Sequence, residues 1–361
     1  MFNSKYLSRL KLFEKVNKKI LAVNPTLPPS RKEPPSSIIT VTEYNSDFSR
    51  VEKNIKISDF ENSVGENKIT WINVDGLRKS DVEKIGAMFK IHPLLIEDII
   101  SNGQRPKVDE MKDIIFTLIY MLNFNQETNS VETEQVSIIL GKNFVLSYQE
   151  FTDKNLFNNI REKIAIKESK FRSNKADYLF YALIDAIVDN YFVIMEKLGE
   201  RIEFLEEEIV QHANTVTLTR INILRKEMIL LKRNITPVRE LVNSLLRTDS
   251  LLIDDKTEKY FKDVYDHIVQ ASELSENYRD MMMNLHDLYL SELNLKMNEV
   301  MKVMAIVTCL LAPATVIGGI FGMNFSRMPW LKNPEGFYLA VAFMLLIPVV
   351  MIYLFKKRGW F

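Results

Sequence analysis

The chain has 361 residues, of which 47% are hydrophobic and 26% are charged, enough for a soluble domain with its own core and for further segments. Its 47 Lys and Arg residues balance its 47 Asp and Glu residues, so no overall positive field favours nucleic acid. The single cysteine, Cys309, excludes an intramolecular disulfide framework and a zinc ribbon, and the four histidines are scattered. Any function must therefore reside in local patterns.

Residues 1–35 are predicted to form a basic, Pro-rich and flexible tail. Six Lys and Arg residues interrupt the first 21 positions, which excludes the apolar core of a signal peptide. Five prolines between Pro25 and Pro35 favour extended backbone and mark a linker. The alternative interpretation is a basic amphipathic stretch that touches a membrane surface or acts as an organelle address.

Residues 36–150 are predicted to form an α/β domain, because short β-branched and aromatic runs alternate with helical patterns. The segment from Lys79 to Ile100 has helical spacing, and His92-Pro93 is typical of a new helix start. The predicted strands cover residues 38–42, 69–74, 114–120, 136–140 and 144–148.

From residue 151 onward the strand signals end and helices dominate. Apolar residues recur at helical intervals over residues 176–210 and 219–246. Neither proline nor glycine occurs between Pro237 and Pro313, so one helix is expected to run from about residue 257 to the first apolar span and beyond, on the order of 80 Å before Pro313. A helix of this length needs lateral partners, which indicates an oligomer.

Two segments near the C-terminus, residues 303–321 and 336–355, contain no charged residue. Each has roughly the 20 residues that cross about 30 Å of hydrocarbon, so both are predicted to span a membrane. Two buried core helices are the alternative, but the second segment lacks the amphipathic pattern of such helices. Lys302 precedes the first span and Lys356-Lys357-Arg358 follows the second, which places both ends in the cytoplasm and residues 322–335 outside.

A single pair of spans is too thin to enclose a path for an ion, so any channel must be built from several copies of the chain. The first span carries Thr308, Thr315, Gly318 and Gly319 among its apolar residues. The second span is rich in Leu, Val, Ile and Met and suits contact with lipid. The first span is therefore the better candidate for lining a pore.

The two spans flank the sequence Phe321-Gly322-Met323-Asn324-Phe325, which Met328-Pro329 follows. This arrangement resembles the signature of the CorA family of magnesium transporters. The resemblance covers residues 38–361 and includes segments 92–98, 176–179, 263–267 and 298–303. It implies a homopentamer with an α/β cytoplasmic funnel, a long stalk helix that continues into the first span, and a second span that surrounds the pore.

The expected organisation combines this resemblance with the local patterns. It comprises a flexible tail at 1–35, an α/β cytoplasmic domain at 36–150, a helical cytoplasmic region at 151–255, a stalk helix at 256–325 with the first span at 303–321, an extracytoplasmic loop at 322–335, the second span at 336–355 and a basic cytoplasmic tail at 356–361.

The resemblance assigns the selectivity filter to Gly322, Met323 and Asn324. Mg2+ dehydrates reluctantly, so a ring of neutral amide oxygens from Asn324 can hold the ion through its water shell. A carboxylate ring would bind too tightly for release during conduction. The alternative role of Asn324 is a cap at the C-terminus of a helix.

The resemblance also implies a set of pore-lining residues. Their intervals of three and four residues keep them on one face of a helix. Met301 and Met304 would form an apolar constriction that gates by dewetting, although a methionine pair at this spacing alone indicates ordinary packing. The full set is Asn298, Met301, Met304, Thr308, Ala312, Thr315 and Gly319.

Members of the family sense magnesium in the cytoplasm. The matching acids here are Asp98 with Glu97 beside it, and Asp263, with Asp185 as a further contributor. Carboxylate oxygens are the hard ligands that Mg2+ selects. If Asp98 and Asp263 meet across a subunit boundary, a cation between them would favour a closed ring and its loss would loosen the ring. The alternative is that these acids are solvated helix residues.

The sequence departs from the family pattern in two places. The outer loop carries two basic residues and one acid, so electrostatic capture of cations by this loop is not expected. Thr308 and Ala312 change the polarity and bulk of the implied pore, which moves the expected position of its narrowest point.

The predicted function is passive transport of Mg2+, with Co2+ as a further candidate ion, through a homopentameric channel that cytoplasmic Mg2+ gates. The expected location is a bacterial plasma membrane, with the lipid bilayer, divalent cations and other copies of the chain as partners and no nucleic acid. No enzyme chemistry is visible. The chain has no phosphate-cradling glycine loop that would power a pump and no intramembrane carboxylate that would suggest proton coupling. The alternatives are a Co2+, Ni2+ or Zn2+ transporter of the same family and a membrane-anchored coiled-coil assembly protein.

Overall fold

The structure is a computed structural model that describes residues 33–57, 65, 67–150, 157–323, 329 and 335–360. Nearly all of the predicted N-terminal tail, Asn324 and most of the loop after it lie outside these residues. The described chain forms two compact units. The first comprises the residues up to Phe204 together with Arg220–Met283, and the second comprises Leu205–Thr219 together with the residues from Asn284 onward.

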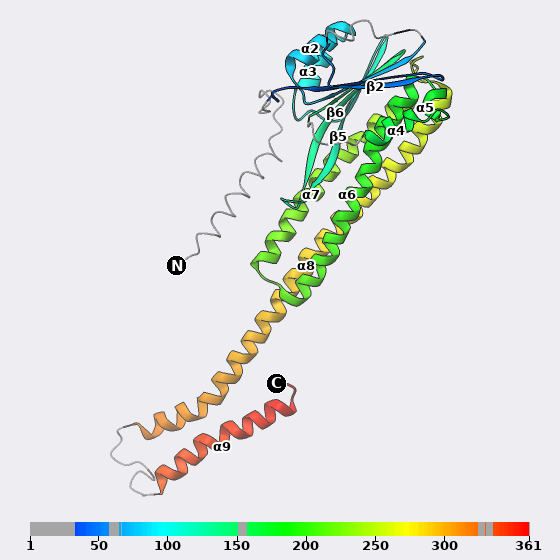
Figure 1. Ribbon diagram of the computed structural model, residues 1–361. Helices are drawn as coiled ribbons and strands as arrows, with labels where there is room; N and C mark the ends of the chain where they lie inside the picture. Colours follow the sequence, from blue (N-terminus) through cyan, green and yellow to red (C-terminus); the bar gives the residue numbers. More distant parts are fainter. Residues whose placement is uncertain are drawn as a thin grey trace. The chain divides into compact units, whose positions relative to one another are not determined.

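The first unit is built on a seven-stranded sheet with the strand order β2-β1-β3-β7-β6-β5-β4 (Figure 1). Strands β3 and β7 pair in parallel, and every other neighbouring pair is antiparallel. The strands are β1 (Ile38–Tyr44), β2 (Ser49–Lys53), β3 (Ile69–Asp75), β4 (Lys107–Met111), β5 (Ile114–Asn125), β6 (Ser130–Gly141) and β7 (Phe144–Gln149).

Two short helices, α2 (Lys79–Met88) and α3 (Pro93–Ile100), cover one face of the sheet (Figure 1). Their apolar side chains and those of the inner strands form one buried cluster. His92 caps α3, because its Nδ1 accepts a hydrogen bond from the backbone N–H of Leu94 at 3.3 Å, and Pro93 occupies the first turn. Gly86 lets the two helices approach closely, since a Cβ there would lie 2.5 Å from Ile96 Cδ1.

On the other face of the sheet, three of the buried polar side chains form a chain of hydrogen bonds. The indole Nε1 of Trp71 donates to Ser147 Oγ at 2.9 Å, and Ser147 Oγ donates to Asn73 Oδ1 at 2.6 Å. Helix α4 (Asn158–Ala165) places the guanidinium of Arg161 5.0 Å from the Trp71 ring centroid. These contacts satisfy polar atoms that would otherwise be costly to bury between sheet and helix.

The helical part of the first unit continues with α5 (Lys170–Ser173) and portions of three long helices, whose remaining residues belong to the second unit. These are α6 (Ala176–His212), α7 (Thr215–Leu246) and α8 (Asp255–Phe321). Arg201 on α6 forms an ion pair with the buried Glu227 on α7 at 2.5 Å. Glu227 also accepts a hydrogen bond from the backbone of Val131, which ties the helices to the β5–β6 hairpin.

In the second unit, the turn between α6 and α7 is fixed by its own hydrogen bonds. Asn214 Oδ1 accepts from the backbone N–H groups of Val216 at 2.8 Å and Thr217 at 3.1 Å, which caps α7. Lys296 on α8 donates from its Nζ to the carbonyl oxygen of Ala213 at 3.2 Å, just beyond the end of α6. A cation at this position satisfies a terminal carbonyl and complements the helix dipole.

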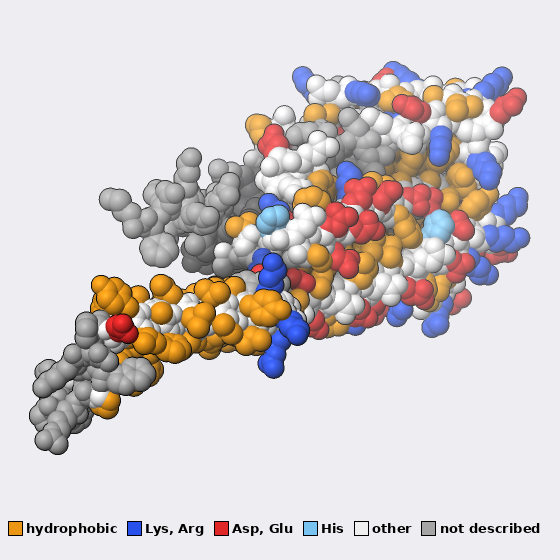
Figure 2. All heavy atoms as spheres, turned by 90° about the horizontal axis from the view of Figure 1, so that it is seen from below, with side chains coloured by type: hydrophobic (Ala, Val, Ile, Leu, Met, Phe, Trp, Pro, Cys, Tyr) orange, Lys and Arg blue, Asp and Glu red, His pale blue; other side chains and the backbone are white. Residues whose placement is uncertain are grey.

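Three described helices are long and apolar enough to cross a membrane: α6, α8 and α9 (Gly336–Lys357). The most apolar stretch of α6 is 67% buried within the protein, whereas the corresponding stretches are 6% buried in α8 and 0% buried in α9. Figure 2 shows this exposed hydrophobic surface as one continuous region on the α8–α9 hairpin. The apolar surface of α6 is used for internal packing, and that of α8 and α9 faces outward.

Candidate functional site

All the residues predicted to line a pore lie on α8, and each of them is exposed in the single chain. The exposed fractions of Met301 and Met304 are 55% and 63%. Helix α9 packs against a neighbouring face of α8, where Cys309, Pro313 and Ile317 line an apolar groove with residues of α9. Of the predicted set only Ala312 also lines this groove. The second span therefore leaves most of the predicted pore face uncovered.

After Asn298, the predicted face is apolar at Met301 and Met304 and carries hydroxyl groups further along. Thr308 Oγ1 donates to the carbonyl oxygen of Met304 at 2.8 Å, and Thr315 Oγ1 donates to that of Leu311 at 3.1 Å. These bonds satisfy the hydroxyl hydrogens within the helix itself. Gly319 leaves open space on this face, because a Cβ added there would meet no atom within 4 Å.

Helix α8 ends at the predicted filter sequence. The backbone N–H of Gly322 donates to the carbonyl oxygen of Gly318 at 2.9 Å, and that of Met323 donates to Ile320 at 3.3 Å. A Cβ at Gly322 would lie 3.0 Å from the Gly318 oxygen, so glycine permits this tight end. The Met323 side chain is 52% exposed, and Asn324 lies outside the described residues.

The predicted cytoplasmic cation ligands occupy separate places in the first unit. Asp98 on α3 accepts a hydrogen bond from Lys107 Nζ at 2.6 Å, and Glu97 beside it is exposed. Burial of the Lys107 ammonium group acts to lower its pKa, but the hydrogen bonds to Asp98 and Asp109 outweigh this effect and raise the pKa above its ordinary value. Asp263 on α8 is exposed, and among the described residues no hydrogen bond or ion pair joins it to Asp98.

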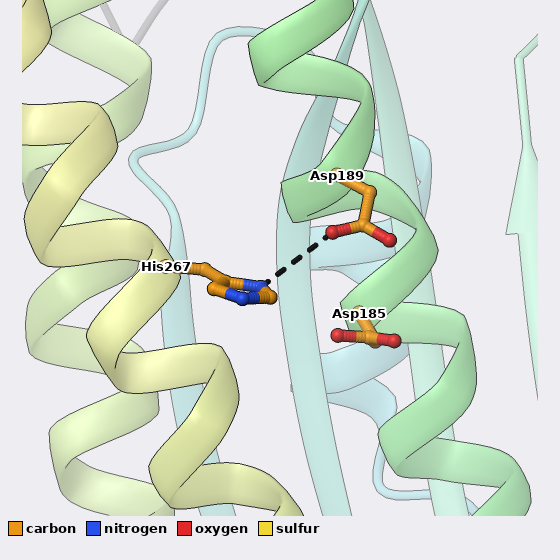
Figure 3. Close-up of side chains that lie close together, drawn as sticks. All are labelled: Asp185, Asp189 and His267. Atoms are coloured by element: carbon orange, nitrogen blue, oxygen red, sulfur yellow. Dashed lines mark ion pairs between the residues drawn. The ribbon is translucent and has the colours of Figure 1, made fainter.

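Asp185 belongs to a cluster that the sequence did not reveal. Figure 3 shows the side chains of Asp185 and Asp189, one turn apart on α6, directed toward His267 on α8. Their potential ligand atoms all lie within 4.8 Å of one another. His267 Nδ1 lies 3.6 Å from Asp189 Oδ1; this nitrogen is buried and has no hydrogen-bond partner among the described residues. Two carboxylates and an imidazole in this arrangement are able to hold a divalent cation.

The cluster is electrostatically poised for a cation. Burial, together with the negative charge of Asp189, raises the pKa of the Asp185 carboxyl to about 6. A hydrogen bond from Tyr181 OH to Asp185 Oδ2 at 3.2 Å and the imidazole of His267 oppose this shift. The charge of Asp263, one turn before His267 on α8, adds to it. A divalent cation would offset the part of this shift that comes from the charges of Asp189 and Asp263.

Asp189 and His267 were missed because the helices that carry them are distant in the sequence. The spacing of Asp185 and Asp189 by four residues was the available signal, as it places two carboxylates on one face of a helix. His267 lies in a segment that the family resemblance includes, but its proximity to Asp185 and Asp189 follows only from the packing of α8 against α6.

Comparisons with known proteins agree with the architecture. The family model described as CorA-like Mg2+ transporter protein matches residues 66–357. The chain is 39% identical over 339 residues to the Cobalt/magnesium transport protein CorA of Thermotoga maritima, covering 91% of this chain and 96% of that protein. It is 32% identical over 291 residues to the Putative metal ion transporter YfjQ of Bacillus subtilis, covering 81% and 89% of the two chains.

Solved structures show the same fold. The complete structure of the CorA magnesium transporter from Methanocaldococcus jannaschii has a TM-score of 0.74 at 23% identity, covering 90% of this chain and 98% of that one. The structure of the full-length CmaX protein has a TM-score of 0.68 at 16% identity. The family model matches most of the chain, and one relative is 39% identical across nearly its whole length. The chain therefore belongs to the CorA family of divalent-cation transporters.

Proposed function

We propose that this transporter carries Mg2+ passively through a pore formed by a homopentamer, and that cytoplasmic Mg2+ closes the pore. The observation that carries the proposal is the uncovered face of α8, which runs from Asn298 to Gly319 and ends at the Gly322-Met323-Asn324 sequence. A single hairpin exposes this face instead of enclosing it. Other copies of the chain would be needed to place such faces around one axis.

The proposed path has three chemically different parts. Exposed Met301 and Met304 would form a constriction that is dry when narrow and conducts when wide enough to hold water. The hydroxyl oxygens of Thr308 and Thr315 would follow. Asn324 would hold the hydrated ion through its amide oxygen at the outer end of the pore, because Mg2+ gives up its water shell reluctantly.

Regulation is assigned to the cytoplasmic acids. Asp98 and Glu97 on one copy and Asp263 on another would share a cation, as the family resemblance implies. The cluster of Asp185, Asp189 and His267 adds a second ligand group within one chain. Binding would hold the cytoplasmic helices in one arrangement and loss of the ion would release them, so a fall in cytoplasmic Mg2+ would open the pore.

Co2+ is the second candidate ion. The imidazole of His267 in the cluster favours it, because nitrogen ligands suit Co2+, Ni2+ and Zn2+ better than Mg2+. The Thermotoga maritima relative is named for both cobalt and magnesium. A membrane-anchored assembly protein without transport activity has no comparable support among the relatives.

We place the protein in a bacterial plasma membrane with both ends in the cytoplasm. Lys302 precedes the first span, and Lys356, Lys357 and Arg358 end the second, which is the distribution that the positive-inside rule gives for cytoplasmic ends.

Uptake of Mg2+ into proteoliposomes that contain the full-length protein tests the proposal. Asn324→Ala should abolish most of the uptake. Asn333→Ala is the matched control, since it removes the other asparagine of the same loop and should leave uptake unchanged. Competition by Co2+ and Zn2+ ranks the ions. Uptake of Co2+ without Mg2+ would make Co2+ the substrate, and no uptake of any divalent ion by the wild-type protein would refute the channel.

A further inference from the structure

Four basic residues lie at the proposed cytoplasmic end of the hairpin. Lys356, Lys357 and Arg358 follow one another at the end of α9, and Lys302 precedes the first span on α8. In the part of the chain that the structure describes, none of their side chains forms a hydrogen bond or an ion pair. Among the described residues these four cations have no anionic partner, so they are able to bind anions from outside the chain.

Contacts between the two helices bring the four cations to one level. A Cβ at Gly318 would lie 3.8 Å from Met344 Cε, and Cys309 lines the same groove as Met351. Because the helices are antiparallel, this pairing continues toward Lys302 and places it opposite the C-terminal end of α9. Figure 2 shows Lys and Arg side chains gathered at one end of the hydrophobic hairpin surface. We call Lys302, Lys356, Lys357 and Arg358 the basic collar.

A defined backbone cap holds the collar in place. The backbone N–H of Trp360 donates to the carbonyl oxygen of Phe355 at 3.0 Å, and that of Gly359 donates to Lys356 at 3.2 Å. Gly359 has a φ of 71°, the left-handed conformation that this double hydrogen bond requires. The helix therefore ends in a Schellman motif directly after Arg358, and the cationic residues stay in its last turn.

The same cap positions an aromatic ring beside the collar. Trp360 folds back onto Phe355, with ring centroids 5.2 Å apart and planes 7° from parallel. Its side chain remains 39% exposed. Tryptophan rings prefer the boundary between hydrocarbon and water, so Trp360 marks the depth at which α9 leaves the hydrocarbon. At this depth the neighbouring cations lie among lipid headgroups.

We propose that the basic collar binds the headgroups of anionic phospholipids, each bridged by ammonium or guanidinium groups from both helices of the hairpin. Each Lys or Arg near an anionic membrane surface contributes about 1 kcal/mol, which is roughly a fivefold preference over a zwitterionic lipid. The proposal depends on the membrane hairpin and on no property of the transported ion. Its failure is therefore distinguishable from failure of the proposed channel.

Spin-labelled lipids test the collar in the full-length protein reconstituted in phosphatidylcholine vesicles. Electron paramagnetic resonance measures the fraction of labelled phosphatidylglycerol and labelled phosphatidylcholine that the protein immobilises. The wild type should prefer phosphatidylglycerol several-fold. The combined Lys356→Gln, Lys357→Gln and Arg358→Gln variant should lose most of this preference, and Lys302→Gln should lose a smaller part.

Two controls separate the collar from general charge and from misfolding. Lys262→Gln removes a cation from the same helix about 60 Å before Lys302 and should leave the preference unchanged. Lys356→Arg with Lys357→Arg keeps the charge and should keep the preference.

Three results would overturn the proposal. The first is equal immobilisation of the two lipids by the wild type, and the second is an unchanged lipid preference in the triple variant. The third is a loss of the wild-type preference when inorganic phosphate is added, if chloride at the same ionic strength does not cause that loss. The last result would assign the collar to soluble phosphate.

Discussion

Helices α6 and α9 are both apolar enough to cross a membrane, yet the apolar surface of α6 is mostly buried in the protein and that of α9 is mostly exposed. In α6, Asp177 precedes the apolar stretch and Asp185 and Asp189 interrupt it, and each of the three acids has an interaction partner inside the first unit. Helix α9 has no charge before Lys356, and although one side packs against α8, no residue of its most apolar stretch is buried. Hydropathy alone therefore does not distinguish a core helix from a membrane span, whereas the placement of acids does.

The largest expected effect concerns a matched pair of leucines. Leu183 on α6 is fully buried, whereas Leu345 on α9 is 67% exposed in the single chain. Leu183→Ala should lower the free energy of unfolding of the first unit by about 2–5 kcal/mol, because it leaves a cavity. Denaturant unfolding followed by fluorescence measures this change. Leu345→Ala leaves that core intact, so a similar loss in both variants would contradict the comparison.

A second prediction uses the acids of α6. Co2+ affinity of the cluster should fall by about tenfold for each pH unit below the Asp185 pKa of about 6, because the ion must displace a proton. In the cation-free protein, a rise in pH has the opposite effect and lowers the stability of the fold. The fold raises this pKa, so the contribution of Asp185 to stability is lost as pH rises through about 6. Isothermal titration and thermal melts between pH 5 and 7.5 measure both effects.

Asp189→Asn should weaken Co2+ binding by at least about tenfold and should also lower the Asp185 pKa. Asp280→Asn is the matched control, since Asp280 lies on α8 and pairs with Arg279 away from the cluster. Equal losses of affinity in the two variants would show that the cluster is not the binding site.

A third prediction concerns the exposed helix. Met304→Ala should raise the residual Mg2+ flux at high internal Mg2+ by a few-fold, because a smaller side chain widens the proposed constriction and lets it hold water. Val307→Ala, at a position also exposed but outside the predicted pore face, is the control. Proteoliposome uptake measures both, and unchanged flux in Met304→Ala would argue that the constriction lies elsewhere.

The smallest effect is expected at Lys296. Lys296→Met keeps the aliphatic stem but removes the hydrogen bond to Ala213, which should cost roughly 0.5–1.5 kcal/mol of stability. Lys296→Arg retains a donor and should recover most of it. The thermal midpoint reports the difference, and a midpoint of Lys296→Met equal to that of the wild type would mean that the cap contributes nothing.

The strands with strong apolar patterns were predicted and are strands in the structure, but β2 and β4 were not. Their sequences, Ser49–Lys53 and Lys107–Met111, are short and polar. Both lie at the edges of the sheet, where charged residues discourage pairing with other chains, so the apolar alternation that identifies a strand is absent. The long helix was expected from about residue 257 and begins at Asp255.

The candidate sites also differ in how far the sequence predicts them. The α8 face from Asn298 to Gly319 follows from the helical repeat and the family resemblance, since it requires only one element. The cluster of Asp185, Asp189 and His267 requires two helices to pack in one register, and no local pattern specifies that register. The assignment of Asn324 to the selectivity filter stays a prediction.

The hydrogen bonds of Thr308 and Thr315 determine which atoms α8 offers to a solute. Each hydroxyl hydrogen points back to a carbonyl of the preceding turn, so each oxygen presents lone pairs outward. The two oxygens lie about 10 Å apart along the helix. The water shell of a cation directs its hydrogens outward, and these hydrogens can donate to the two oxygens. In the proposed pore, this face would therefore offer hydrogen-bond acceptors to a hydrated cation without carrying a charge.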